Sequence, residues 1–207
     1  MAQKNHALDD KITNAALREF LESGYEKASM RKIAAAAGVT IGAIYTRYPT
    51  KDQLFLSLVL PLMERIDQAF CSLKGAYGSP ETVEPSQLAQ SMQTESQAIL
   101  HLLFDDYDRA VLLLCRSQGS SLESFFDGVL ERKIQETIAY FRSAQLPHPD
   151  AGVLRLLVSG QFHMYFQILS EGCDLEEAKH RMYAAMIYHT GGWLTLLRMQ
   201  ESEQTEV

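Results

Sequence analysis

Apolar residues recur at helical spacing along most of the 207-residue chain. Near the N-terminus, Leu8, Ile12, Ala16 and Phe20 lie four residues apart, so they fall on one face of a helix. After Lys51 the sequence shows no internal repeat and no strand-like alternation of apolar and polar residues. The pattern therefore predicts an all-α protein.

Capping and breaking residues divide this pattern into nine expected helices. The first starts at a cap formed by Asp9 or Asp10 and ends at Gly24. The fourth should be kinked or divided at Pro61, because proline removes a backbone hydrogen bond. A loop is expected over residues 74–86. The second to ninth expected helices cover about residues 30–37, 41–48, 51–74, 86–103, 105–117, 122–145, 152–170 and 175–199.

Two short helices near the N-terminus have unusually clear boundaries. Ser29 is a good N-cap for one, and Gly38 ends it where a tight turn needs a residue that tolerates positive φ. Thr40 caps the next helix, which ends before Pro49. Two short helices joined by a turn of about three to four residues with glycine form a helix-turn-helix unit. The second helix of such a unit enters the major groove of DNA.

The following helix begins with a capping box, in which Thr50 is the N-cap and Gln53 is the third helical residue. The start of a helix attracts anions, because its first backbone N–H groups lack helical partners. Together with Lys51, this helix start is an expected site for a DNA phosphate.

The charge is unevenly distributed along the chain. The net charge is −7, yet residues 1–52 carry eight basic and six acidic side chains. This balance of +2 leaves −9 for the remainder. A positive N-terminal part on an acidic body is expected if only that part meets phosphate.

Residues 8–56 resemble the DNA-binding domain of the TetR/AcrR family of bacterial regulators, through many positions at fixed spacing. The sequence departs from the common pattern at Ala28, often a threonine, and at Thr46 and Arg47, often an aromatic residue followed by histidine. These departures bear on the operator sequence more than on the assignment. The matching positions are Ile12, Ala15, Ala16, Phe20, Gly24, Tyr25, Ser29, Met30, Ile33, Ala34, Ala37, Gly38, Val39, Thr40, Gly42, Ile44, Tyr45, Tyr48, Pro49, Thr50, Lys51, Asp52 and Leu54.

The resemblance implies a DNA-binding domain over residues 1–52 and a ligand-binding and dimerisation domain over 53–207, in a nine-helix TetR-like architecture. It also implies a homodimer on a near-palindromic operator of double-stranded DNA, usually as a repressor. Ile41 and Ala43 are the best candidates for base readout, whereas Arg31 has a plain surface charge as its alternative. The implied DNA contacts are Ser29, Arg31, Thr40, Ile41, Ala43, Tyr45, Thr46, Tyr48 and Lys51.

The same resemblance implies a small-molecule effector and a helical dimer interface in the second domain. An apolar pocket lining and an ordinary helical core use the same residue types, so both interpretations stay open for each pocket residue. The candidate pocket residues are Met92, His101, Phe104, Tyr107, Cys115, Phe125, Tyr140, Phe141 and Phe166. The candidate interface residues are Gly160, Met164, Met182, Met186, Gly191 and Trp193.

Other classes of protein find less support. No nucleophile motif, phosphate-binding loop or dinucleotide fingerprint is present, so we expect neither an enzyme nor a cofactor. The three cysteines are far apart, which predicts neither disulfides nor a metal site and suits a reducing compartment. The family resemblance implies a bacterial cytoplasmic protein associated with the nucleoid. No apolar run is long enough for a membrane span. The alternative function is a helical module that has lost DNA binding and acts through a protein partner.

Overall fold

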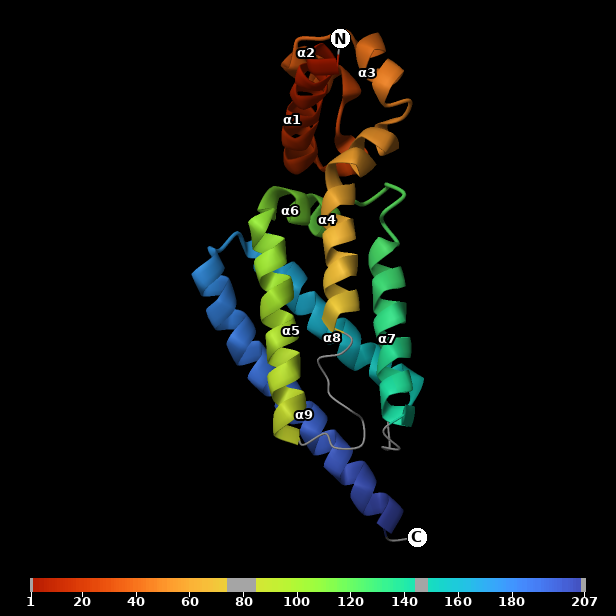
Figure 1. Cartoon of the computed structure of the whole chain (residues 1–207), viewed down its shortest axis with the longest axis vertical. Coiled ribbons are helices and arrows are strands. Elements are labelled where there is room, and N and C mark those ends of the chain that lie inside the picture. Colours follow the sequence, from red (N-terminus) through yellow and green to blue (C-terminus); the bar gives the residue numbers. More distant parts are fainter. Residues whose placement is uncertain (1, 74–84, 144–148, 206–207) are drawn as a thin grey trace. The chain divides into compact units, whose positions relative to one another are not determined.

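α-Helix is the only regular secondary structure in residues 2–73, 85–143 and 149–205, which are those that the computed structural model describes (Figure 1). This confirms the predicted all-α class for the described residues. Side chains are described within these ranges except at residues 2–5, 70–73, 85–88, 126, 140 and 197–205. Over these ranges the helices are α1 (Ala2–Lys27), α2 (Met30–Ala37), α3 (Ile41–Arg47), α4 (Lys51–Leu73), α5 (Pro85–Asp105), α6 (Tyr107–Cys115), α7 (Phe125–Ser143), α8 (Ala151–Glu171) and α9 (Leu175–Thr205).

The helix order agrees with the sequence, but several boundaries were predicted wrongly. α1 runs straight through Asp9 and Asp10, so neither residue caps its start. Gly24 does interrupt the helical geometry, with a φ of 72°, although helical turns resume until Lys27. α4 continues past Pro61 as one element, so the predicted division of this helix did not occur. α9 continues to Thr205, beyond the predicted end.

The boundary between α6 and α7 differs most from the sequence pattern. α6 ends at Cys115, two residues before its predicted end, and α7 begins only at Phe125. At the start of α6 the Asp106 side chain makes no capping hydrogen bond and pairs with Arg109 instead. The intervening residues 116–124 form turns that contact the N-terminal helices. We call them the 116–124 segment.

The chain forms two compact units, each with contributions from two stretches of sequence. The first unit consists of Met1–Arg65 with Asp106–Phe126, and the second consists of Ile66–Asp105 with Asp127–Val207. α6 and the 116–124 segment therefore pack with the N-terminal helices. The predicted domain boundary at residue 52 divides a DNA-binding function from a ligand-binding one. It stays a prediction.

A continuous apolar core holds the first unit together. Ile12 and Phe20 of α1 are fully buried, as are Ile33 of α2 and Ile44 of α3. Burying such a side chain contributes about 1.5–3 kcal/mol. α4 and α6 complete this core with Leu54, Phe55, Leu58, Val59, Ala110, Leu112 and Leu113.

The core of the second unit is formed by one face from each of its helices. α9 packs against both α5 and α8 (Figure 1). Phe141 of α7 stacks on Trp193 of α9, with ring centroids 6.2 Å apart. The remaining large buried side chains include Leu100, Leu103, Val129, Leu130, Ile134, Leu154, Phe162, Tyr165, Ile168, Leu169, Met182 and Met186.

Candidate DNA-binding site

α2 and α3 are joined by the tight turn that the sequence predicts. Gly38 has a left-handed φ of 67°, and its N–H donates to the carbonyl of Ala35 at 3.2 Å. The N–H of Val39 then donates to the carbonyl of Ala34 at 3.0 Å. These two bonds close the end of α2 and turn the chain directly into α3. The helix-turn-helix geometry thus follows from one glycine and local backbone bonding.

The recognition helix α3 is short and is oriented by a single buried residue. The hydroxyl of Thr40 accepts a hydrogen bond from the N–H of Ala43 at 3.1 Å, which caps the helix as predicted. Ile44 is fully buried against the first unit's core, whereas Ile41 and Tyr45 are 38% and 43% exposed. The face that carries the proposed base-reading positions therefore points to solvent.

Glycine at position 42 leaves this exposed face of α3 without a protruding side chain. A Cβ atom there would meet only the Thr40 hydroxyl, at 3.9 Å. Ala43 beside it is half-buried and carries only a methyl group. Thr46, one turn later, is exposed and donates its hydroxyl hydrogen to the carbonyl of Gly42 at 2.9 Å. The backbone of α3 can consequently approach the edge of a base pair closely.

A buried carboxylate positions the start of α2. Glu19 of α1 is only 8% exposed and accepts a hydrogen bond from the N–H of Ser29 at 3.0 Å. The Ser29 hydroxyl caps the helix by accepting from the N–H of Lys32. Arg31, in the first turn, is exposed. Glu19 could not be singled out from the sequence, because a charged residue at that position resembles an ordinary surface residue of α1.

The C-terminal end of α3 is attached to α1 by an ion pair. Arg47 donates from Nε to a carboxylate oxygen of Asp9 at 2.6 Å, with side chains 24% and 35% exposed. The neighbouring Tyr48 is half-buried, and burial and then the charge of Asp9 raise the pKa of its phenol. Tyr48 is therefore neutral at physiological pH and can donate a hydrogen bond.

At the start of α4 the predicted cap is present, but Lys51 has an internal position. The Thr50 hydroxyl accepts from the N–H of Gln53 at 3.0 Å. The Lys51 ammonium donates to the carbonyls of Tyr25, Glu26 and Ala28, at 2.8, 3.1 and 3.4 Å.

The Lys51 ammonium also lies 4.5 Å from the ring centroid of Tyr25. All three of its N–H groups therefore have carbonyl partners at the end of α1. A phosphate contact by this side chain would compete with those bonds. The backbone N–H groups of the first turn remain the stronger part of the expected anion site.

The exposed positive charge of the first unit includes the predicted contact Arg31 and two residues that were not predicted as DNA contacts, Lys27 and Lys32. Arg47 and Lys51 are engaged in internal contacts, as described above. Lys27, Arg31 and Lys32 are exposed, and the Lys32 ammonium lies 4.0 Å from Glu19 with 69% of its side chain exposed. The positive charge balance of the N-terminal region was therefore informative. However, Lys51, the basic residue expected to bind a phosphate, makes internal contacts.

The predicted pocket residues fall into different environments. Met92 and Phe141 are buried in the second unit, Phe104 and Phe166 are half-buried there, and His101 is exposed. Tyr107, Cys115 and Phe125 belong to the first unit and are half-buried. The side chain of Tyr140 lies outside the described residues. All nine stay predicted ligand contacts.

Buried polar groups in the second unit were missed by the sequence analysis. Lys133 of α7 pairs with Glu95 of α5 at 2.6 Å, and the two side chains are 16% and 6% exposed. Tyr165 of α8 is buried nearby in the same core, and burial and the charge of Glu95 raise the pKa of its phenol. Ser96 and Thr190 are also buried. No sequence spacing reveals the grouping of Glu95, Lys133 and Tyr165, because they come from three different helices.

The predicted interface residues separate into two groups. Met182, Met186 and Trp193 are at most 7% exposed within the single chain, so they form part of its own core. Gly160 and Gly191 are exposed, and Met164 is half-buried. The large exposed apolar side chains of α8 and α9 are instead Leu156, Tyr183, Ile187 and Tyr188.

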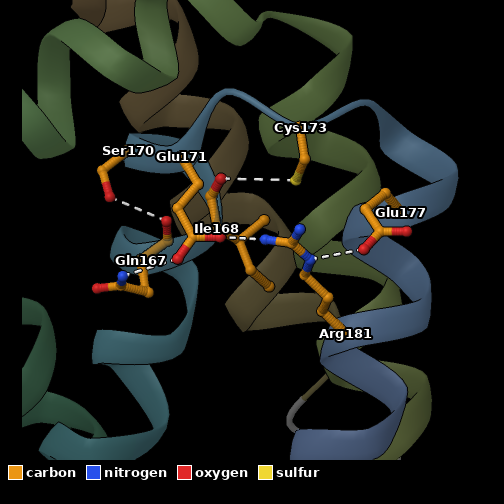
Figure 2. A network of polar contacts seen from close by, with 7 residues as sticks. All are labelled: Gln167, Ile168, Ser170, Glu171, Cys173, Glu177 and Arg181. Carbon is orange, nitrogen blue, oxygen red and sulfur yellow. Dashed lines mark hydrogen bonds and ion pairs between the residues drawn. The ribbon is translucent and has the colours of Figure 1, made fainter.

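A surface network holds the turn between α8 and α9 (Figure 2). Arg181 of α9 donates to Glu171 at the end of α8 and to Glu177, the latter at 2.8 Å. Glu171 also accepts from the side-chain amide of Gln167 at 2.8 Å. The Cys173 thiol points to the carbonyl of Ile168 at 3.7 Å. Figure 2 shows that these contacts link the end of α8 to the first turns of α9.

The described residues also bear on metal binding and membrane insertion. No three histidine, cysteine, aspartate or glutamate side chains gather there in a way that could hold a metal ion. No helix among the described residues combines the length and the apolar character needed to cross a membrane.

Comparison with known proteins places the chain among bacterial regulators. The family model for bacterial regulatory proteins of the tetR family matches residues 12–58. The chain is 39% identical over 67 residues to a helix-turn-helix transcriptional repressor of Mycobacterium tuberculosis, covering 32% of the chain and 35% of the relative. It is 27% identical over 130 residues to the transcriptional repressor KstR of Rhodococcus jostii, covering 61% and 59%. The chain thus spans only part of the length of these relatives.

Solved structures extend the likeness along most of the chain. A TetR-like regulator from a Rhodococcus species is 16% identical with a TM-score of 0.62, covering 91% of this chain and 96% of that one. FadR of Bacillus subtilis, solved in complex with stearoyl-CoA, is 18% identical with a TM-score of 0.57, covering 85% and 96%. At these identities the likeness concerns the fold. Residues 12–58 thus match the model of the tetR family of bacterial regulatory proteins, and the helix order of the described chain is similar in fold to a solved TetR-like regulator.

Proposed function

We propose that this protein is a DNA-binding transcriptional repressor that acts as a homodimer and is released from its operator by a small molecule. The observation that carries the proposal is the exposed outer face of α3. Ile44 fixes this helix in the core while Ile41 and Tyr45 face solvent, with Gly42 and Ala43 leaving room for a base pair. Both named relatives are repressors.

The DNA contacts divide by chemistry into base readout and phosphate binding. Ile41 and Ala43 offer apolar surface, which suits the methyl group of thymine. The Tyr45 and Tyr48 hydroxyls and the exposed Arg31 suit phosphate oxygens. The remaining proposed contacts come from Ser29, Thr40, Thr46 and the helix start at Lys51.

An exposed apolar surface on α8 and α9 supports the homodimer. Tyr183, Ile187 and Gly191 are spaced four residues apart, so they form one exposed stripe along α9. Tyr188 beside it is 84% exposed, and Leu156 of α8 is 73% exposed. Large apolar side chains in this number mark an interaction surface. A two-fold dimer would place two recognition helices about 34 Å apart, in successive major grooves.

The effector is proposed as a small, largely apolar molecule that enters the second unit. The solved FadR contains stearoyl-CoA, and the candidate pocket residues of this chain are mostly aromatic or apolar. A ligand releases a repressor by binding one of its conformations more tightly than the DNA-bound one.

The test is selection of genomic DNA fragments by the purified protein, followed by a salt titration. We expect one enriched near-palindrome and a log affinity that falls linearly with log salt, as displacement of counterions requires. Tyr45→Ala should weaken binding, whereas Thr94→Ala, an exposed α5 position, should not.

The absence of enrichment at low salt, from a folded dimer, would overturn the proposal. It would favour the alternative of a helical module that acts through a protein partner.

A further inference from the structure

The first turn of α4 is held by a segment that lies more than sixty positions further along the sequence. The carboxylate of Asp52 accepts two hydrogen bonds from one residue, Ser121. The Ser121 N–H donates at 2.9 Å and its hydroxyl donates at 2.7 Å, each to a different carboxylate oxygen. This bidentate contact joins the 116–124 segment to the residue that follows Lys51.

Two further contacts attach the same segment to the end of α1. The N–H of Tyr25 donates to the carbonyl of Arg116 at 2.9 Å. Gly119 has a φ of 81° and lies against Glu26, so that a Cβ added there would be 3.5 Å from the Cβ of Glu26. This distance is an ordinary van der Waals contact, so it is the positive φ that favours glycine at position 119.

Tyr25 is the point where these contacts meet. Its ring packs at 5.1 Å from that of Phe55 and carries the Lys51 ammonium on its face. Burial, then the charge and hydrogen bond of Asp52, raise the pKa of the Tyr25 phenol, so it stays protonated and donates to that carboxylate. Asp52 is thus bound by α1 on one side and by Ser121 on the other.

We infer that the 116–124 segment is a positioning element of the DNA-binding surface, which acts on it through the Ser121–Asp52 contact. This inference rests on the proposed DNA-binding function. Tyr48 and Thr50 directly precede the first turn of α4, and the N–H groups of that turn form the expected phosphate site. A bidentate contact on Asp52 restricts how that turn can move, and a preorganised site loses less entropy when it binds.

The segment lies outside residues 12–58, which match the family model. The complete DNA-binding unit of this chain therefore requires residues that the motif does not include. Ser121 is a positioning residue, because it touches Asp52 and not the DNA contacts themselves.

The test compares six full-length variants with the wild-type protein, including Asp52→Asn and the combination of Asp52→Ala with Ser121→Ala. Asp52→Ala removes the acceptor, Ser121→Ala removes the hydroxyl donor, and Gly119→Ala strains the positive-φ turn of the segment without touching Asp52. Ser124→Ala is the matched control, because Ser124 is an exposed serine of the same segment. Amide hydrogen exchange in residues 51–55 and affinity for the selected operator are measured for each.

We expect exchange in this turn to rise and operator affinity to fall by about tenfold in the first two variants, since the binding-competent fraction falls. Gly119→Ala should act in the same direction, and Ser124→Ala should match the wild type. Asp52→Ala combined with Ser121→Ala should lower operator affinity no further than Asp52→Ala alone, because both substitutions act on the same Ser121–Asp52 contact. Asp52→Asn should retain much of the affinity, since an amide can accept from the N–H and donate to the hydroxyl.

Three outcomes would overturn the inference. Exchange in residues 51–55 could stay unchanged in Ser121→Ala. Exchange could rise while operator affinity stays at the wild-type value. Asp52→Ala could weaken binding while Ser121→Ala and Gly119→Ala do not, which would make Asp52 a direct DNA contact. A wild-type protein that binds no DNA would refute the proposed function instead, and the exchange data would still decide whether the segment orders the turn.

Discussion

The carboxylate of Glu19 accepts the backbone N–H of Ser29, and this bond between α1 and the start of α2 is buried. The Ser23 hydroxyl also donates to it, at 3.3 Å. A side chain from one helix thus completes the backbone bonding of the next, so that the helix-turn-helix unit is attached at its first residue.

Removing this carboxylate should destabilise the first unit. Glu19→Ala leaves the Ser29 N–H without its acceptor, which costs about 1–3 kcal/mol. Glu19→Gln retains an acceptor oxygen of the same reach and should lose clearly less. Urea denaturation followed by circular dichroism measures both variants. Equal losses in Glu19→Ala and Glu19→Gln would show that charge, and not the hydrogen bond, is what matters at this site.

The two glycines of the helix-turn-helix unit should respond oppositely to alanine. Gly38 has positive φ, so Gly38→Ala should cost about 1–2 kcal/mol of stability. Gly42 lies in the first turn of α3 with open space around it, so Gly42→Ala should leave stability unchanged or raise it by up to about 1 kcal/mol.

Gly42→Ala should nevertheless weaken operator binding, because the new methyl group lies on the exposed face of α3. Thermal denaturation and operator titration on the same samples separate the two effects. Full operator affinity in Gly42→Ala would mean that α3 does not approach the DNA by this face.

Removing one partner of the buried Glu95–Lys133 pair should destabilise the protein strongly. Replacing both partners with apolar residues should destabilise it much less. Removing one charge leaves the other buried without its partner, which destabilises by about 3–5 kcal/mol. Glu95→Leu combined with Lys133→Met replaces both with apolar groups and should be closer to the wild type than either single variant. A double-mutant cycle in urea measures the coupling. Simple additivity of the two single losses would contradict this expectation.

Stability should decrease as the medium becomes acidic, in part through His189. Burial lowers the pKa of His189, while a bond from Nε2 to the carbonyl of Leu157 at 3.1 Å opposes this shift. Its buried Nδ1 has no hydrogen-bond partner among the described residues, so a proton added there would be poorly accommodated. Because the folded-state pKa is the lower one, the unfolded chain binds the proton first as pH falls. The contribution of neutral His189 is therefore complete above about pH 6.5 and is lost as pH falls from there through the folded-state pKa.

Urea denaturation at pH 7.5 and 5.5 tests this assignment. His189→Gln should show a smaller loss between the two pH values than the wild type. His163→Gln, at an exposed histidine of α8, should behave as the wild type does. An unchanged pH dependence in His189→Gln would assign the effect to another group.

Features fixed by neighbouring residues could be predicted from the sequence, and those fixed by distant ones could not. Ser29, Thr40 and Thr50 cap their helices as predicted, because a capping hydroxyl reaches a backbone N–H three residues away. The left-handed turn at Gly38 is equally local. These local signals were sufficient to predict the helix-turn-helix unit from the sequence.

The features that the sequence did not reveal depend on partners from other helices. Asp9 was expected to cap α1 and instead pairs with Arg47, 38 positions away. Lys51 stays a predicted phosphate contact, but the sequence did not reveal that its ammonium binds the carbonyls of Tyr25, Glu26 and Ala28. Helical periodicity cannot tell an outward face from an inward one when a helix is apolar on both sides. For that reason it did not reveal that Met182, a predicted interface residue, is buried within the single chain.

The two-part composition of the first unit matters for anyone who exchanges domains between regulators. A chimera that takes only residues 1–65 from this protein would separate Asp52 from Ser121 and Tyr25 from Arg116. The transplanted residues would then contact the recipient protein's own turn in place of the 116–124 segment. The sequence of that turn is adapted to different N-terminal helices. Residues 106–126 should be carried over with the N-terminal stretch, so that the graft has two junctions more than the sequence motif suggests.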